Sequence, residues 1–190
     1  MLGAVENPIK VKLDQFYRIE INDFAVTVAK TALWISEHQM IKETEDIVHT
    51  EIDFLPLTSY ANIVEANALR IDWEDVVPKD KLDYIMGNPP FIGARLMSPS
   101  QKVDIDNIFG PKWQNKGDLD YVSAWFKEAS DYMNGTEIKT AFVATNSISQ
   151  GQSVANLWKP LFNNGAEIIF AYRSFKWNSE STTKLVYMLL

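Results

Sequence analysis

Apolar residues recur along the first half of the chain at spacings that predict strands alternating with helices. The apolar run 16–21 predicts a short strand. Asn22 and Asp23 then precede apolar residues at helical spacing, which predicts a capped amphipathic helix over 23–40. The polar stretch 42–58 predicts a loop, and the runs 62–64 and 82–86 predict two further strands.

The second half continues the same alternation after a long irregular segment. Residues 92–118 are rich in glycine and proline, which predicts a loop holding one short helix near 99–108. The remaining predicted elements are a helix over 121–133, a strand over 140–145, a helix over 154–162 and strands over 168–172 and 184–190. Such alternation predicts an α/β sheet with helices on both faces, and ligands of such sheets bind beyond the carboxyl ends of the strands.

Composition and charge narrow the class of protein. With 190 residues, 46% of them hydrophobic, the chain is long enough to form one domain with a core of ordinary size. It has no apolar run long enough to span a membrane and no signal peptide, so we expect a cytoplasmic protein without a membrane partner. Residues 1–83 carry 16 acidic and 8 basic side chains, whereas residues 84–190 carry 9 and 10, so the net charge of -7 belongs to the first half.

Cysteine and histidine usage makes metal chemistry improbable. The chain has no cysteine, which excludes disulfides, thiol catalysis and cysteine-ligated zinc. Its two histidines, His38 and His49, cannot form a metal site without carboxylate ligands. We therefore expect a function that needs no metal.

The run Asn88-Pro89-Pro90-Phe91 carries the most specific chemistry in the sequence, because it directly follows a predicted strand. The side-chain carbonyl of Asn88 and the main-chain carbonyl of Pro89 can accept the two N–H bonds of an aromatic amine. These acceptors would free the nitrogen lone pair for attack on a sulfonium methyl group, through orientation and electrostatics alone. Phe91 offers a flat surface on which a base flipped out of a duplex can stack. Alternatively, the two prolines merely end a strand and Phe91 fills the core.

This run resembles the catalytic motif of amino-directed DNA methyltransferases, in the form typical of enzymes that methylate adenine N6. The resemblance implies a Rossmann-like sheet, S-adenosylmethionine as cofactor and double-stranded DNA as partner. It also implies that Glu20 binds the cofactor ribose hydroxyls, that Ile21 flanks the cofactor adenine, and that Asn67 and Ala68 contact it. Phe175, in Phe175-Lys176-Trp177, would stack on the flipped base beside Phe91.

Several phrases spread over the chain resemble more narrowly the MmeI-like enzymes, single-chain type II restriction-modification proteins that join nuclease, methylase and specificity regions. They include Ala32-Leu33-Trp34-Ile35, Asn67-Ala68-Leu69-Arg70 and Thr145-Asn146-Ser147-Ile148. The resemblance implies a partial catalytic domain over 1–190, with a cofactor-side half at 1–83 and a catalytic, DNA-facing half at 84–190. The resemblance leaves open whether the parent also cuts DNA as a type II restriction endonuclease.

One departure from the family concerns its glycine-rich cofactor loop, which should precede Glu20. Residues 1–19 contain a single glycine, Gly3, and no Gly-x-Gly. We therefore expect a fragment of a longer protein that lacks the first, central strand of the sheet, the nuclease and the target-recognition region. Such a fragment is expected to be inactive alone and to depend on the remaining domains of its parent.

Two other functions remain open from the residues themselves. The same acceptor geometry suits another planar amine or amide, such as an RNA base or a protein glutamine. An acidic residue at a strand end also suits a non-catalytic nucleotide-binding module, although the absent glycine loop weakens that reading. In the long loop, Arg95, Lys102, Lys112 and Lys116 could contact DNA phosphates, but nearby aspartates favour a solvated loop.

Overall fold

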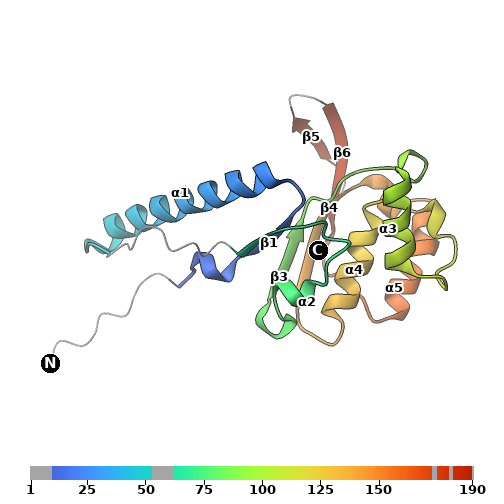
Figure 1. Ribbon diagram of the computed structural model, residues 1–190, viewed down its shortest axis with the longest axis horizontal. Helices are drawn as coiled ribbons and strands as arrows, with labels where there is room; N and C mark the ends of the chain where they lie inside the picture. Colours follow the sequence, from blue (N-terminus) through green and yellow to red (C-terminus); the bar gives the residue numbers. More distant parts are fainter. Residues whose placement is uncertain (1–9, 53–61, 173–174, 180–181, 190) are drawn as a thin grey trace. The chain divides into compact units, whose positions relative to one another are not determined.

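The chain forms two compact units, Met1–Val76 (unit 1) and Val77–Leu190 (unit 2). The computed structural model describes residues 10–52, 62–172, 175–179 and 182–189, and beyond residue 172 it describes the backbone alone. Each unit contains its own sheet (Figure 1).

Unit 1 pairs two short parallel strands and carries one long helix. Strand β1 (Tyr17–Glu20) follows the 3-10 helix η1 (Leu13–Gln15) and pairs in parallel with β2 (Asn62–Glu65). Between them runs α1 (Asp23–Val48), and the short helix α2 (Trp73–Val76) ends the unit. The predicted strands over 16–21 and 62–64 are thus confirmed.

Helix α1 is longer than its sequence pattern predicted. Asn22 caps its start by accepting the N–H of Ala25 at 3.0 Å, as expected. The helix then continues to Val48, where His49 adopts a left-handed conformation, so the loop predicted from residue 42 was wrong over 42–48. The polar residues of that segment include Lys and Glu, which are good helix formers, and their polarity reflects exposure rather than irregular structure.

Unit 2 contains a four-stranded sheet in the order β3-β4-β6-β5. Its strands are β3 (Tyr84–Gly87), β4 (Lys139–Thr145), β5 (Phe175–Ser179) and β6 (Thr182–Leu189). Its helices are η2 (Lys79–Lys81), η3 (Ala94–Leu96), α3 (Pro99–Phe109), η4 (Lys116–Asp118), α4 (Ser123–Met133), η5 (Asn146–Ser149), the π-helix η6 (Val154–Trp158) and α5 (Lys159–Asn163). β3 and β4 are parallel, whereas β6 is antiparallel to both of its neighbours.

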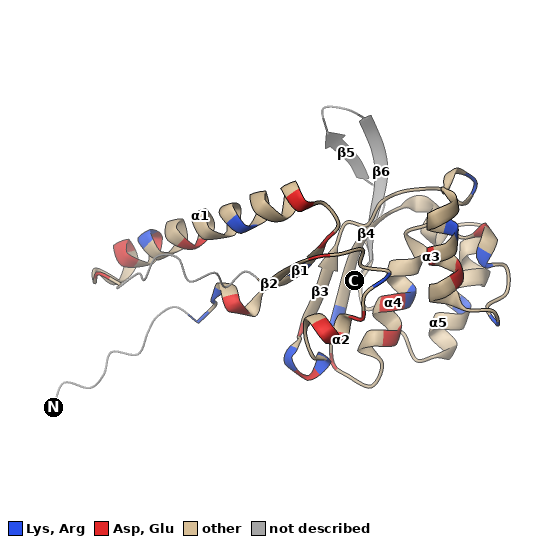
Figure 2. Cartoon of the chain, in the orientation of Figure 1, with Lys and Arg blue, Asp and Glu red and all other residues tan. Residues whose placement is uncertain are grey.

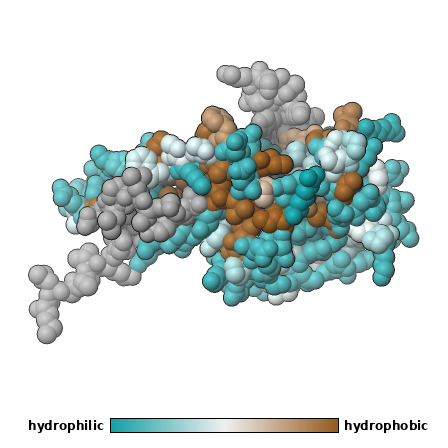
Figure 3. Space-filling view, viewed as in Figure 1, coloured by the Kyte–Doolittle hydropathy of each residue, from teal (hydrophilic) through white to brown (hydrophobic). Residues whose placement is uncertain are grey.

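The core of unit 2 lies between β4 and the predicted apolar face of α4. The Phe126 ring of α4 packs edge-on against Phe142 of β4 and against Trp158 of η6, with ring centroids 5.2 Å apart in both pairs. Figure 1 shows α3 and α5 beside α4 on the same side of the sheet. On the opposite face of β3, Tyr84 and Met86 are exposed. Figure 3 shows apolar residues at the surface over the strands and a mostly hydrophilic surface over these helices.

The α/β alternation is confirmed, whereas helices on both faces of one Rossmann-like sheet stay a prediction. The strands form two separate sheets, and among the described residues no strand hydrogen-bonds to both β1 and β3. The predicted absence of a central strand stays a prediction.

The strand predicted over 168–172 was also wrong. This segment has no strand beyond an isolated bridge residue at Ala171, and Ile168, Ile169 and Phe170 are exposed. The second edge of β4 is occupied by β6, so this apolar run has no place beside it. The predicted helix over 154–162 consists of the π-helix η6 followed by α5.

The described residues form neither a membrane-spanning helix nor a cluster of metal ligands. None of the helices described there has both the length and the apolarity needed to cross a membrane. In that part of the chain no three His, Asp or Glu side chains gather as a metal site requires. His38 instead lies against the ring of Trp34 on α1.

Candidate functional site

Strand β3 delivers the Asn88-Pro89-Pro90-Phe91 run to the carboxyl edge of the unit 2 sheet. Its last residue, Gly87, pairs with Phe142 of β4. A Cβ atom on Gly87 would lie 3.1 Å from two carbons of the Phe142 ring, which is closer than side chains normally approach. Glycine avoids this tight contact, whereas a side chain at position 87 would have to displace the buried Phe142 ring by a few tenths of an ångström.

The four residues of the run differ in exposure. Pro89 is buried and Phe91 is half-buried, whereas Asn88 and Pro90 are exposed. The side-chain amide of Asn88 hydrogen-bonds to none of the residues that the structure describes. A buried proline thus anchors the run, while the amide beside it stays accessible to a ligand at the end of the strand.

Hydrogen bonds with residues 120 and 121, just before α4, hold the segment that follows Phe91. The N–H of Tyr121 donates to the carbonyl of Ile92 at 2.8 Å, and the N–H of Ala94 donates to Oδ1 of Asp120 at 3.0 Å. The other oxygen of Asp120 accepts the hydroxyl of Ser147 at 2.5 Å. Sequence reasoning missed Asp120, whose only signal was its position just before an apolar helix.

Phe175 lies on a backbone row that crosses the sheet. Thr145, the last residue of β4, pairs with Val186 of β6, and Val186 pairs with Phe175 of β5. This row lies at the carboxyl end of β4, the edge at which the Asn88 run also leaves the sheet. The side chain of Phe175 lies outside the described residues, so its predicted contact with a base stays a prediction.

In unit 1, Glu20 ends β1 with both of its carboxylate oxygens in hydrogen bonds. Oε1 accepts the backbone N–H groups of Ile21 at 3.1 Å and Asn22 at 3.3 Å, and Oε2 accepts Nη2 of Arg18 at 2.7 Å. Partial burial alone would raise the pKa of Glu20, but the hydrogen bond and charge of Arg18 and the two backbone donors outweigh it and lower the pKa. The group is therefore held as a carboxylate.

Asn67 and Ala68 lie in the turn after β2, at the same end of the unit 1 sheet as Glu20. The N–H of Ala66 donates to the carbonyl of Glu20 at 2.9 Å, which joins the two segments. Oδ1 of Asn67 accepts the N–H of Leu69 at 2.9 Å, and the carbonyl of Ala68 accepts Nε1 of Trp73 at 2.8 Å. The structure therefore brings the predicted cofactor residues of unit 1 together, and Ile21 beside them is exposed.

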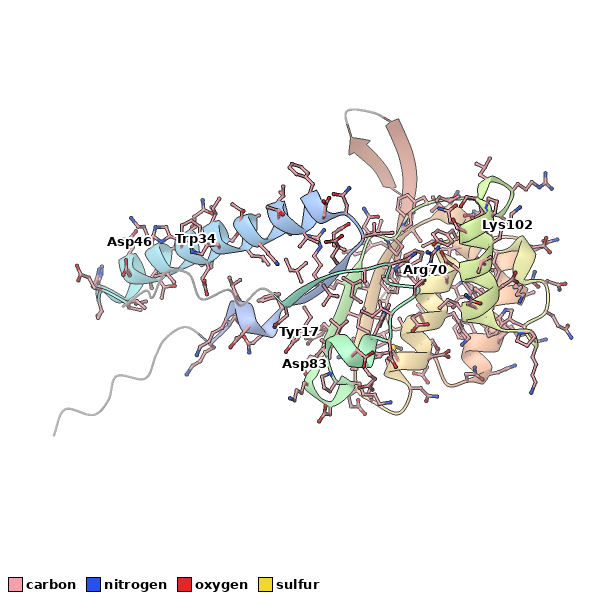
Figure 4. All side chains as sticks on the ribbon, in the orientation of Figure 1. Tyr17, Trp34, Asp46, Arg70, Asp83 and Lys102 are labelled. Atoms are coloured by element: carbon pink, nitrogen blue, oxygen red, sulfur yellow. The ribbon has the colours of Figure 1, made fainter. Side chains whose placement is uncertain are left out.

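The basic residues of the long loop are only partly available to a ligand. Nζ of Lys116 pairs with Asp106 at 2.8 Å and donates to the carbonyl of Gly110 at 3.0 Å. Lys102 is exposed on α3 (Figure 4). Figure 2 shows Lys and Arg interspersed with Asp and Glu over α3 and α4. This mixture agrees with the reading of a solvated surface.

Comparisons with known proteins give a consistent assignment. A profile of the family described as "MmeI, DNA-methyltransferase domain" matches residues 2–188. The chain is 44% identical over 195 residues to DNA methyltransferase A of Bacillus subtilis (strain 168), a match that covers 100% of this chain and 22% of that protein. Its structure is similar to that of the type IIL restriction-modification enzyme MmeI in complex with DNA, with a TM-score of 0.89 and 40% identity over 95% of this chain and 25% of that one. The chain thus spans about a quarter of the length of these relatives.

Proposed function

We propose, because the chain belongs to the MmeI DNA-methyltransferase domain family as its motifs predicted, that it transfers a methyl group from S-adenosylmethionine to N6 of adenine in DNA. The observation that carries this proposal is the accessible amide of Asn88 beside the buried Pro89, at the carboxyl end of β3. No side chain with a strong base is needed for this reaction. Placement of neutral acceptors is enough.

Asn88 and Pro89 perform the positioning step. Oδ1 of Asn88 and the carbonyl of Pro89 each accept one N–H of the adenine amine, which draws the nitrogen lone pair out of conjugation with the ring. The cofactor supplies a methyl group activated by its sulfonium centre. As the N–C bond forms and the S–C bond breaks, these two carbonyls stabilise the positive charge that develops on nitrogen, and the excess proton leaves to water. Their preset orientation is the source of the rate gain.

Aromatic residues hold the base outside the duplex. Phe91 is half-buried and follows the two acceptors directly, so its ring can stack on an adenine whose amine they hold. We assign the second stacking surface to Phe175, since its backbone row ends at the same edge of the sheet. Stacking replaces the contacts that the base loses when it leaves the helix.

The residues of unit 1 fit the cofactor. Glu20 is held ionised, so it can accept the two hydroxyls of a ribose through the lone pairs that its present partners leave. Ile21 is exposed next to it and offers an apolar surface to the adenine. Asn67 would contact the adenine through its amide group and Ala68 through its backbone, because Oδ1 of Asn67 already accepts one N–H.

The partner that we propose is double-stranded DNA, bound by the whole protein. Both relatives are about four times longer than this chain, and one of them was solved in complex with DNA. The mixed charges over α3 and α4 suggest that most phosphate contacts come from other regions of such a protein. We further propose that the protein acts in a restriction-modification system, in which a nuclease cuts DNA that lacks the methyl group.

The test is the identity of the methylated product. The intact protein in which this chain occurs is incubated with labelled S-adenosylmethionine and, in separate arms, with DNA, RNA or a glutamine-containing protein. Digestion and mass spectrometry should find N6-methyladenine in the DNA arm. Label in RNA or protein alone would favour the other planar amines and amides. Cofactor binding without label in any arm would favour a non-catalytic module.

A further inference from the structure

The carboxylate of Asp120 joins the two loops that leave neighbouring parallel strands of unit 2. Oδ1 accepts the N–H of Ala94, in the loop that follows β3, at 3.0 Å. Oδ2 accepts the hydroxyl of Ser147, in the turn that follows β4, at 2.5 Å. That hydroxyl also lies 2.8 Å from Oγ1 of Thr145, the last residue of β4. One side chain therefore holds both loops at the edge of the sheet where Asn88 lies.

A backbone link reinforces this attachment next to Phe91. The N–H of Tyr121 donates to the carbonyl of Ile92 at 2.8 Å. The adjacent residues Asp120 and Tyr121 therefore hydrogen-bond to Ala94 and Ile92 respectively. Ile92 is the next residue after Phe91. The run 88–91 is thus held at its start by the pairing of β3 with β4. At its end it is held by the hydrogen bonds that Asp120 makes with Ala94 and Ser147 and that Tyr121 makes with Ile92, which we call the clamp.

The charge of Asp120 suits it to this task. Hydrogen bonds to an ionised acceptor are shorter and stronger than those between neutral groups. Asp120 and Ser147 are both partly buried, where competition from water is reduced. Asn88 has no side-chain hydrogen bond to a described residue, so its position depends on how the backbone is held at the two ends of the run.

We propose that Asp120 is a positioning residue for methyl transfer, which fixes Asn88 and Phe91 through the backbone of residues 92–94. This inference rests on the proposed function. In this role Asp120 acts through its hydrogen bonds to Ala94 and Ser147 rather than by contact with the amine or the cofactor. Its loss should therefore lower kcat through misplacement of the acceptors, while the cofactor residues of unit 1 are unaffected.

The experiment measures kcat, the KM for S-adenosylmethionine and the thermal unfolding temperature of Asp120→Ala in the intact protein. We expect kcat to fall about 10- to 100-fold, since displacement of reacting groups by about 1 Å costs up to that much. The KM for S-adenosylmethionine should stay within about threefold, because the residues proposed to bind the cofactor are unchanged in this variant.

Two variants separate positioning from simple loss of stability. Asp120→Asn keeps an acceptor for Ala94 and can donate to Ser147, so it should recover part of the lost kcat. Tyr121→Phe removes the 2.7 Å hydrogen bond from the Tyr121 hydroxyl to the buried Asp104, in the same segment, and leaves the backbone link to Ile92. It should lower the unfolding temperature but keep kcat within about twofold.

The inference is overturned if Asp120→Ala keeps kcat within twofold of the unchanged protein, or loses no more than Tyr121→Phe. Should Asp120→Ala fail to fold, Ser147→Ala removes one half of the clamp, and unchanged kcat in that variant overturns the inference equally. If the unchanged protein methylates no adenine, the proposed function fails and this inference fails with it. The two failures are thus distinguishable.

Discussion

Unit 1 and unit 2 hold their predicted site residues in different ways. In unit 2, several core residues are fully buried, among them Leu119, Val122, Ala144 and Ile148. In unit 1, α1 buries only Val26, Ala29 and Ile41 among its described residues and exposes large apolar side chains, among them Phe24, Met40 and Ile47.

The difference between the units predicts two kinds of response to substitution. Asn88 is placed by close packing beneath it, so small changes of volume in unit 2 should disturb stability and catalysis together. Glu20 is placed by hydrogen bonds from its own neighbours, so changes in unit 1 should act mainly on cofactor affinity.

The largest effect is expected for Asn88→Ala in unit 2. Removal of one positioned acceptor should lower kcat about 10²- to 10³-fold, by analogy with the loss of one oxyanion-hole hydrogen bond. The Kd for S-adenosylmethionine, measured by calorimetry, should barely change. Asn134→Ala, at an exposed amide after α4, is the matched control and should keep full activity. Persistent methylation in Asn88→Ala would remove the central support of the proposed function.

The next effect is expected for Gly87→Ala, which tests whether packing places the run. The added Cβ meets the Phe142 ring at 3.1 Å, and such overpacking costs about 1–3 kcal/mol of stability. Denaturant unfolding should show this loss, together with a lower kcat. Gly117→Ala is the control, because no atom lies within 4 Å of its added Cβ. Equal stability of the two variants would contradict close packing beneath Asn88.

A smaller effect of a different kind is expected for Glu20→Gln in unit 1. Loss of the carboxylate should weaken cofactor binding about tenfold, which corresponds to roughly 1.4 kcal/mol. At saturating cofactor, kcat should stay unchanged, since the acceptors of unit 2 are intact. Glu65→Gln is the control, because Glu65 pairs with Glu20 in the strand register but is exposed. A fall in kcat without a change in Kd would break the division between the units.

The smallest effect is expected for Arg18→Gln, through the pKa of Glu20. Arg18 lowers this pKa, so the ionised form contributes stability above the ordinary glutamate pKa and loses it as the pH falls through the lowered value. Without Arg18 the pKa should rise, and both stability and cofactor affinity should be lost at a higher pH on acidification. Titrations of unfolding and binding between neutral and acidic pH should show the shift, whereas Lys30→Gln, on exposed α1, should not. Superimposable titrations would show that Arg18 does not set this pKa.

The run that we propose as catalytic could be predicted from the sequence because it consists of four consecutive residues. Asn88, Pro89, Pro90 and Phe91 need only a preceding strand, and the apolar residues before Gly87 supplied that signal. Asp120 could not be predicted. Its partners Ala94 and Ser147 lie 26 and 27 residues away, and no periodicity records such hydrogen bonds.

The errors in the predicted elements have a common cause. The polar residues 42–48 form a helix, and the apolar residues 168–172 do not form a strand. In both places the pattern of polar and apolar residues was a misleading guide to the secondary structure. Residues 42–48 extend an exposed helix. Residues 168–172 lose their place beside β4 to a strand nearer the end of the chain.

By itself, the sequence determined the α/β class and the family, and it supplied the residues that we propose as catalytic, because local patterns and short motifs encode them. Only the tertiary structure decided that the described strands form two hydrogen-bonded sheets, that the Phe142 ring lies close against Gly87, and that Asp120 joins two loops. These depend on contacts between distant segments, whose formation rests on packing volume and hydrogen-bond geometry rather than on the order of neighbouring residues.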